Sequence, residues 1–247
     1  MTLTGPGPVA KALAHALALS ALAACAAPAP PSEPFDPSEA QNRKTHELNK
    51  SLDKALLGPA SEGYGSAIPE PVQRGVQNFA GNLDLPGDVL NGLLQGRPVR
   101  ASENTLRFVL NTTIGIGGLF DPARALGIEG KPTDFGETLH VWGVAEGAYN
   151  ELPVLGPSTD RDTVGRVVDI FINPVRLAIP DEGRTALAGV GVASTLGDRY
   201  RFGDTVDSIL YDSADSYTQA RLLYLQNRRF ELGQTTGETD FEDPYAE

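Results

Sequence analysis

The chain has 247 residues, of which 20 are Lys or Arg and 32 are Asp or Glu, so its formal net charge is −12. This acidic balance argues against nucleic acid as a partner. One cysteine and three histidines are too few for an internal disulfide or for the usual zinc-binding sets. A hydrophobic content of 40% suffices for a folded core, whereas 27 Gly and 19 Pro predict short, interrupted helices.

Residues 1–24 are typical of a secretory signal peptide. The apolar run ALAHALALSALAA follows Lys11 and is too short to span a bilayer as a helix. The run leads into the tetrapeptide LAAC, which resembles the lipobox that a bacterial signal peptidase cuts, here between Ala24 and Cys25. The Cys25 thiolate is the nucleophile that would carry diacylglycerol. Cys25 is therefore predicted to be the lipid anchor, with a further acyl group on its amino nitrogen.

Both ends of the mature chain have the composition of unfolded segments. Residues 25–35 combine the anchor with a proline-rich stretch, which favours an extended tether of roughly 3.1 Å per residue. Residues 231–247 hold six acidic residues and no basic one, which predicts a disordered acidic tail. Ala26 stands where an aspartate often retains lipoproteins in the inner membrane, so we expect sorting to the outer membrane. The folded body is expected as one domain over 36–230.

The body shows helical rather than strand periodicity. Pro71 is predicted to begin a helix, and Pro86 to interrupt it before a shorter helix that ends at Gly96. Further apolar stripes at helical spacing lie at 106–114, 164–171 and 217–224. We therefore predict a mainly α, single domain of short amphipathic helices broken by glycine and proline.

Two segments after residue 114 invite a functional interpretation. Gly115, Gly117 and Gly118 let the backbone bend sharply before Phe120 and Asp121. Termination of a helix explains such a cluster, and a channel or hinge is the alternative. Further along, aromatic residues alternate with turn residues, as in a folded core or in an interfacial aromatic belt.

Sequence signatures of nucleotide-binding or hydrolytic enzymes are missing: the chain has neither a phosphate-binding loop nor a Gly-x-Ser-x-Gly elbow. A serine hydrolase would require Ser158 or Ser194 to lie beside His46 or His140 in the fold. Hydrolysis of a lipid stays an alternative on that basis. No cofactor and no metal is expected.

Taken in order, the residues of the body resemble the VacJ/MlaA family of outer-membrane lipoproteins over about 36–229. The positions that carry this resemblance are Asp36-Pro37, Asn42-Arg43, Asn49, Asp53, Pro69, Pro71, Asn78-Phe79, Asn82, Pro86, Asn91, Gln95-Gly96, Arg107-Phe108, Asn111-Thr112, Asp121, Phe135-Gly136, Trp142-Gly143, Tyr149, Leu152-Pro153, Gly156-Pro157, Arg161-Asp162, Asp215, Tyr217, Arg221, Tyr224 and Arg228.

The resemblance implies a ring of helices in the inner leaflet of the outer membrane, with a central amphipathic channel, docked against trimeric porins. Phospholipid misplaced in the outer leaflet would pass through it to a soluble periplasmic carrier, without covalent chemistry. A structural lipoprotein that scaffolds an envelope complex is the alternative. The residues assigned to the channel or its hinge are Asn111, Gly115, Gly117, Gly118, Phe120, Asp121, Phe135, Gly136, Trp142, Gly143, Tyr149, Arg161 and Asp162.

The sequence departs from the family's pattern in two places. In the first helix, where the family usually has aromatic residues, this chain has Gln41, His46 and Leu48. In the loop around Tyr149, Ala148 replaces a proline, and Asn150-Glu151 replace apolar residues. The first helix and this loop are therefore the places where we expect the structure to differ from the family.

Overall fold

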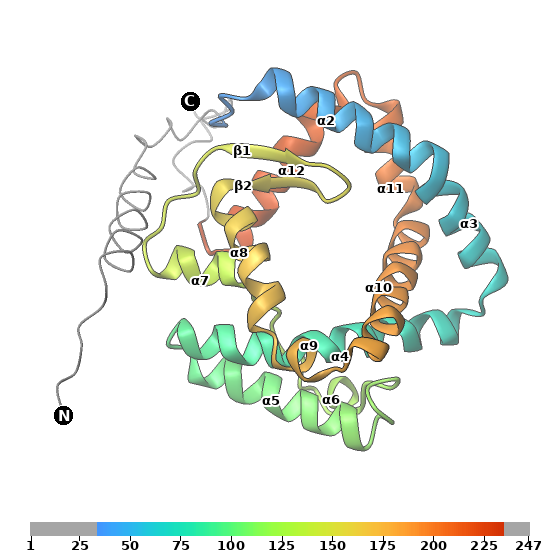
Figure 1. Ribbon diagram of the computed structural model, residues 1–247, viewed down its shortest axis with the longest axis vertical. Helices are drawn as coiled ribbons and strands as arrows, with labels where there is room; N and C mark the ends of the chain where they lie inside the picture. Colours follow the sequence, from blue (N-terminus) through green and yellow to red (C-terminus); the bar gives the residue numbers. More distant parts are fainter. Residues whose placement is uncertain (1–33, 235–247) are drawn as a thin grey trace, which may run out of the picture.

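The helices of this protein are arranged in a ring (Figure 1). The structure, a computed structural model, describes residues 34–234. The signal peptide at 1–24, Cys25 with most of the tether, and all but the first residues of the acidic tail lie outside the described residues. The prediction of a mainly α, single-domain ring is confirmed.

Residues 39–141 run around the ring in one direction, and residues 160–231 run back along it in the other (Figure 1). The elements are α2 (Glu39–Leu52), the π-helical η1 (Asp53–Leu57), α3 (Gly58–Ala67), α4 (Glu70–Leu94), α5 (Pro98–Thr113), α6 (Pro122–Ala125), α7 (Phe135–Val141), β1 (Tyr149–Leu152), β2 (Gly156–Thr159), α8 (Asp160–Ile172), α9 (Pro174–Ala178), α10 (Asp181–Arg201), α11 (Gly203–Asp207), the π-helical η2 (Ser208–Asp212) and α12 (Ser216–Glu231). Neighbouring helices pack closely where a side chain is missing: Gly92 of α4 lies against Ala101 of α5.

Helix ends coincide with capping residues in the sequence. The side chains of Asp134, Thr159 and Asp215 accept backbone N–H bonds in the first turns of α7, α8 and α12. Asn173 follows the last residue of α8 and caps α9, whose first residue is Pro174. The helices predicted at 106–114, 164–171 and 217–224 are confirmed as α5, α8 and α12.

The predicted interruption at Pro86 is wrong, because α4 continues through the proline to Leu94. A proline inside a helix cannot donate a backbone hydrogen bond and crowds the preceding turn. The carbonyl of Leu83 in that turn accepts a hydrogen bond from Asn173 Nδ2 at 3.1 Å, so a side chain of another element supplies a donor there. Packing along α5 adds further support. Tertiary contacts therefore outweigh the local tendency of proline to end a helix.

An antiparallel hairpin, β1 and β2, interrupts the helices. Its connection needs two residues with positive φ, Val154 (68°) and Gly156 (74°). Asparagines of α2 supply the hydrogen bonds that a neighbouring strand would make: Asn42 donates to the Tyr149 carbonyl at 3.0 Å and accepts from the Glu151 amide at 3.1 Å. The hairpin was not predicted, since each strand has only four residues and depends on these distant side chains.

Burial is inverted relative to an ordinary soluble domain. In the described part of the chain, buried polar or charged residues outnumber buried apolar ones, and the apolar cluster is confined to Tyr149, Tyr217 and Leu225 with Tyr224 beside them. Many large apolar side chains are instead exposed, among them Val109, Phe120 and Phe171. Contiguous exposed apolar surface marks contact with a membrane or another protein.

Candidate functional site

A cavity of about 950 Å³ lies among α4, α5, the loop at 129–134, α8 and the end of α12. Its only large aliphatic side chains are Leu85, Leu155 and Ile170, and most of the other lining residues are polar or charged. Ordinary ligand pockets are mostly apolar with a few polar groups. This cavity therefore suits a polar or ionic group that water still reaches.

Helix α5 forms one wall of the cavity and turns its polar face toward it. Asn104 and Asn111 are buried and lie on the same helical face as Arg107, whereas Val99 and Val109 are exposed on another face. Asn104 donates to the Lys131 carbonyl at 3.1 Å and thereby fixes the loop.

At the end of this wall, Asp121 links α5 to α6. Arg107 forms an ion pair with Asp121 at 2.7 Å, and Asn111 donates to the same carboxylate at 3.0 Å. Burial alone would raise the pKa of Asp121, but hydrogen bonds from the Arg124 amide, Arg107 and Asn111 outweigh it and lower the pKa. Asp121 is therefore a fixed negative charge in the wall.

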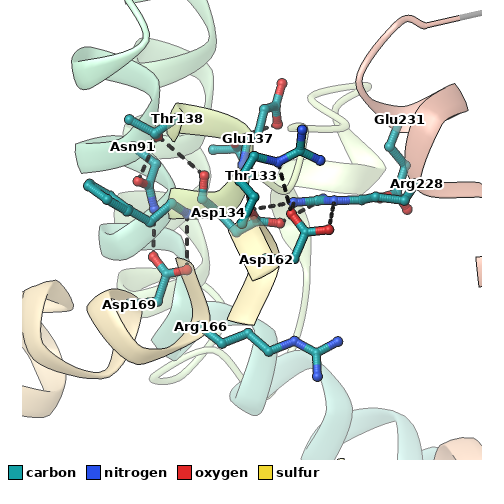
Figure 2. Close-up of polar contacts among 12 residues, drawn as sticks. Asn91, Thr133, Asp134, Glu137, Thr138, Asp162, Arg166, Asp169, Arg228 and Glu231 are labelled. Atoms are coloured by element: carbon teal, nitrogen blue, oxygen red, sulfur yellow. Dashed lines mark hydrogen bonds and ion pairs between the residues drawn. The ribbon is translucent and has the colours of Figure 1, made fainter. Parts of the chain in front are cut away.

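Opposite lies an acidic wall shared by α4 and α8. Asp169 accepts hydrogen bonds from Asn91 Nδ2 at 2.9 Å and from the Phe135 amide at 3.0 Å (Figure 2). Burial raises the pKa of Asp169. Burial raises the pKa of Asp88 to about 7, the carboxylates of Asp84, Asp169 and Asp134 add to the effect, and the Thr133 amide opposes it.

Arg228 joins three parts of the ring next to the cavity. From α12 it contacts Asp134 at the start of α7 (2.7 Å) and Asp162 in the first turn of α8 (3.0 Å), as Figure 2 shows. Tyr224 donates a further hydrogen bond to Asp162 at 2.7 Å. Burial would raise the pKa of Asp162, but the Arg228 and Tyr224 contacts lower it. Only glycine fits at position 136 in this cluster, because a Cβ there would lie 2.6 Å from the Asp162 carboxylate.

The exposed apolar residues complement the polar cavity. On α8, Val164, Val167 and Phe171 lie at helical spacing and are 53%, 51% and 68% exposed. Trp142 after α7 is 55% exposed and donates its indole N–H to the Leu94 carbonyl at 3.1 Å. No helix within 34–234 is both long and apolar enough to cross a membrane.

The structure distributes the sequence-predicted site residues over several places. Asn111 and Asp121 lie in the cavity wall, and Asp162 and Gly136 lie at the Arg228 contact. The others lie elsewhere: Gly115, Gly117 and Gly118 in the turn after α5, exposed Phe120 behind them, Phe135 edge-on to Trp142, Gly143 at the end of α7, Tyr149 in the apolar cluster, and Arg161 buried beside Asp162.

The turn after α5 is held by backbone geometry. Gly117 and Gly118 have φ values of 71° and 99°, and a Cβ on Gly118 would meet Asn82 at 2.6 Å. The turn is thus packed against α4.

Sequence reasoning did not assign a site role to Asp88, Asn91, Asp169 or Arg228. Each is a polar residue on a helix that also carries an apolar stripe. The spacing of polar side chains on the other face of the helix is the feature of the sequence that could have indicated a cavity wall. No group of His, Cys, Asp or Glu in the described chain is arranged as a metal site.

A ring of helices with many exposed large apolar side chains, around a cavity lined mostly by polar ones, is typical of a protein that contacts a membrane or another protein and holds a polar group. Comparisons with known proteins agree with this class. The model of the MlaA lipoprotein family matches residues 34–231, and the chain belongs to that family.

The chain is 33% identical over 198 residues to the intermembrane phospholipid transport system lipoprotein MlaA of Escherichia coli K12, covering 78% of this chain and 76% of that protein. The protein of the same name from Haemophilus influenzae is 32% identical over 226 residues, 90% of this chain and 88% of that protein. A solved chain from work on the structural basis for maintenance of bacterial outer membrane lipid asymmetry superimposes with a TM-score of 0.70 at 32% identity, covering 80% and 98% of the two chains.

Proposed function

We propose that this protein is a lipoprotein of an intermembrane phospholipid transport system, which removes phospholipid from the outer leaflet of the outer membrane. The observation that carries the proposal is the polar cavity of about 950 Å³ inside a ring with an apolar exterior. The names of the Escherichia coli and Haemophilus influenzae relatives support it.

The energetics of lipid extraction favour such a ring. A charged headgroup in hydrocarbon costs several kcal/mol, and each of roughly thirty acyl methylenes in water costs about 0.8 kcal/mol. A lipid that places its headgroup in the polar cavity and leaves its chains along the bilayer avoids both costs. The lining carries both signs of charge, including Arg166 and Asp169, so the cavity can accommodate an anionic phosphate and a cationic headgroup amine.

The proposal places the ring at the periplasmic face of the outer membrane, in its inner leaflet. The acylated Cys25 would hold it there permanently, because several acyl chains bind a bilayer far more strongly than one. A trimeric porin would be the membrane partner, and a soluble periplasmic carrier would accept the lipid. None of these steps needs covalent chemistry.

The first test is the amount of phospholipid in the outer leaflet of cells that lack this protein. We expect a rise that wild type reverses and Cys25→Ser does not, because this variant lacks the acyl chains that would hold the protein permanently at the outer membrane. Accessibility of phospholipid to externally added phospholipase measures the rise. Unchanged outer-leaflet phospholipid in the deletion strain contradicts the proposal.

A second test distinguishes a duct from a scaffold. Gly81 lines the cavity, and a Cβ built there meets nothing within 4 Å, so a side chain can begin there without strain and Gly81→Trp adds bulk to the cavity. Gly63 on α3 is equally open and does not line the cavity, so Gly63→Trp is the matched control. We expect transport to fail in Gly81→Trp alone, at equal protein level. Full transport by a folded Gly81→Trp variant favours the scaffold.

A further inference from the structure

Two departures from the family pattern meet in space, far from the large cavity. His46 of α2 lies between Glu151 of β1 and Ser216 of α12. His46 Nε2 is 3.0 Å from Ser216 Oγ, and His46 Nδ1 is 3.4 Å from Glu151 Oε1. A hydroxyl on one imidazole nitrogen and a carboxylate on the other is the arrangement of a serine hydrolase triad.

The serines considered from sequence are arranged differently. Ser158 is fully buried, donates to the Thr159 carbonyl at 3.4 Å and accepts from Thr163 at 2.9 Å. Ser194 lies within α10. In the described chain neither makes a hydrogen bond to His46 or His140, so Ser216 is the hydroxyl partner of His46.

The acid and the base are held in fixed orientations. Glu151 accepts hydrogen bonds from Asn49 Nδ2 at 3.2 Å and from the Tyr149 hydroxyl. The His46 ring packs edge-on against Tyr217 with centroids 5.7 Å apart. His46 and Glu151 are both buried, at 2% and 5% exposure. Such support leaves the imidazole one direction in which to exchange a proton, toward Ser216.

Ser216 borders a second cavity of about 420 Å³, next to Arg43, Lys50 and the segment at 213–217. Ser216 is the first residue of α12, and among residues 34–234 the backbone N–H groups of Ser216 and Tyr217 have no acceptor. Lys50 Nζ lies 3.5 Å from Ser216 Oγ. Unpaired N–H groups and a cation beside a nucleophile are donors that stabilise an oxyanion.

We propose that Ser216, His46 and Glu151 form a catalytic triad that hydrolyses small carboxylic esters. Ser216 Oγ bonds to the ester carbonyl carbon while His46 Nε2 takes its proton and Glu151 stabilises the imidazolium. The carbon–alkoxy bond then breaks, and the leaving alcohol takes the proton from His46. Water attacks the acyl-serine, gives a proton to His46, and releases the carboxylic acid as that proton returns to Ser216.

The cavity restricts the substrate to short acyl esters. Its volume is near the lower limit for ligand pockets, and its lining includes Glu47 and Asp215 as well as Arg43. Asp215 already pairs with Arg43 at 3.0 Å, so Lys50 beside Ser216 is the cation of this lining that remains for an oxyanion. The two cavities share no lining residue, so the activity is separate from phospholipid transport through the large cavity.

The test uses the full lipoprotein purified in detergent without ester bonds. Its probes are p-nitrophenyl butyrate and a fluorophosphonate, which reacts with an activated serine by displacement of fluoride. We expect the fluorophosphonate on Ser216, located by mass spectrometry, and turnover that falls roughly 10³-fold in Ser216→Ala and in His46→Gln. Ser51→Ala is the matched control, because Ser51 of α2 donates to the Glu47 carbonyl at 2.7 Å and does not line the cavity.

Circular dichroism establishes that each variant keeps its helices. Wild-type protein that is folded and neither labelled at Ser216 nor active on the butyrate ester overturns the proposal. Turnover that is equal in wild type and Ser216→Ala overturns it as well, since the activity then resides elsewhere. Transport in cells should be unchanged by Ser216→Ala, so the two functions are tested separately.

Discussion

At the residue scale, the acidic wall of the large cavity makes stability depend on pH. The pKa of Asp88 is raised to about 7, well above its value in an unfolded chain, so folding favours the protonated form. The stabilisation that protonated Asp88 gives to the folded state is complete below about pH 4 and is lost as pH rises through about 7. We expect Asp88→Asn to stabilise the protein at pH 8 by roughly 1–3 kcal/mol, and by about a third of that amount at pH 5, where only part of the difference has developed.

Thermal unfolding in detergent at pH 5 and pH 8 measures this difference. The pKa values of Asp121 and Asp162 are lowered, so their contributions are lost only at more acidic pH and stay constant between 5 and 8. Glu62→Gln, on the exposed surface of α3, controls for the loss of one negative charge. If Asp88→Asn raises the stability equally at both pH values, the pKa of Asp88 is not raised in the folded protein.

At the element scale, Arg228 ties α12 to the beginnings of α7 and α8. Asp162 is buried, so removal of the Arg228 guanidinium leaves its carboxylate with only the longer ion pair to Arg161 at 3.4 Å. We expect Arg228→Met to lower the free energy of unfolding by roughly 3–5 kcal/mol, a large part of a typical total. The neighbouring Arg229→Met breaks a more exposed ion pair with Glu146 and should cost at most about 1 kcal/mol.

Chemical denaturation measures both variants, and hydrogen exchange of α12 shows where the structure opens. Asp162→Asn in the Arg228→Met background should recover part of the loss, because it removes a buried carboxylate that has lost its shorter ion pair. If Arg228→Met and Arg229→Met cost the same, the contact does not hold these elements together.

The elements also show what could be predicted from sequence. Helices α8 and α12 follow from apolar stripes and local stop signals, which depend on neighbouring residues alone. The hairpin and the continuous α4 depend on Asn42 and Asn173, each distant in the chain from what it contacts. For the site, periodicity separates two faces of a helix such as α5 but does not say which face lies inside. Asp88, Asn91 and Asp169 were missed for that reason.

At the scale of the whole molecule, the inverted distribution of side chains predicts affinity for membranes even without the lipid anchor. The exposed apolar residues of α5, α7 and α8 would enter a bilayer laterally, whereas no described helix can cross it. We expect protein with Cys25→Ser to float with phospholipid vesicles. A charge placed in the hydrocarbon costs about 2.5–3.5 kcal/mol, so adding Val109→Asp or Phe171→Asp should weaken binding on the order of 100-fold.

Vesicle flotation at increasing lipid concentration gives the binding constants. Ser66→Asp on α3 adds the same charge at an exposed position away from the apolar residues and should leave binding nearly unchanged. Equal losses in all three variants would mean that net charge, already −12, governs binding. Selective loss in Val109→Asp and Phe171→Asp would instead mean that the ring's exterior contacts lipid. The polar cavity would then open beside hydrocarbon, which the proposed passage of headgroups requires.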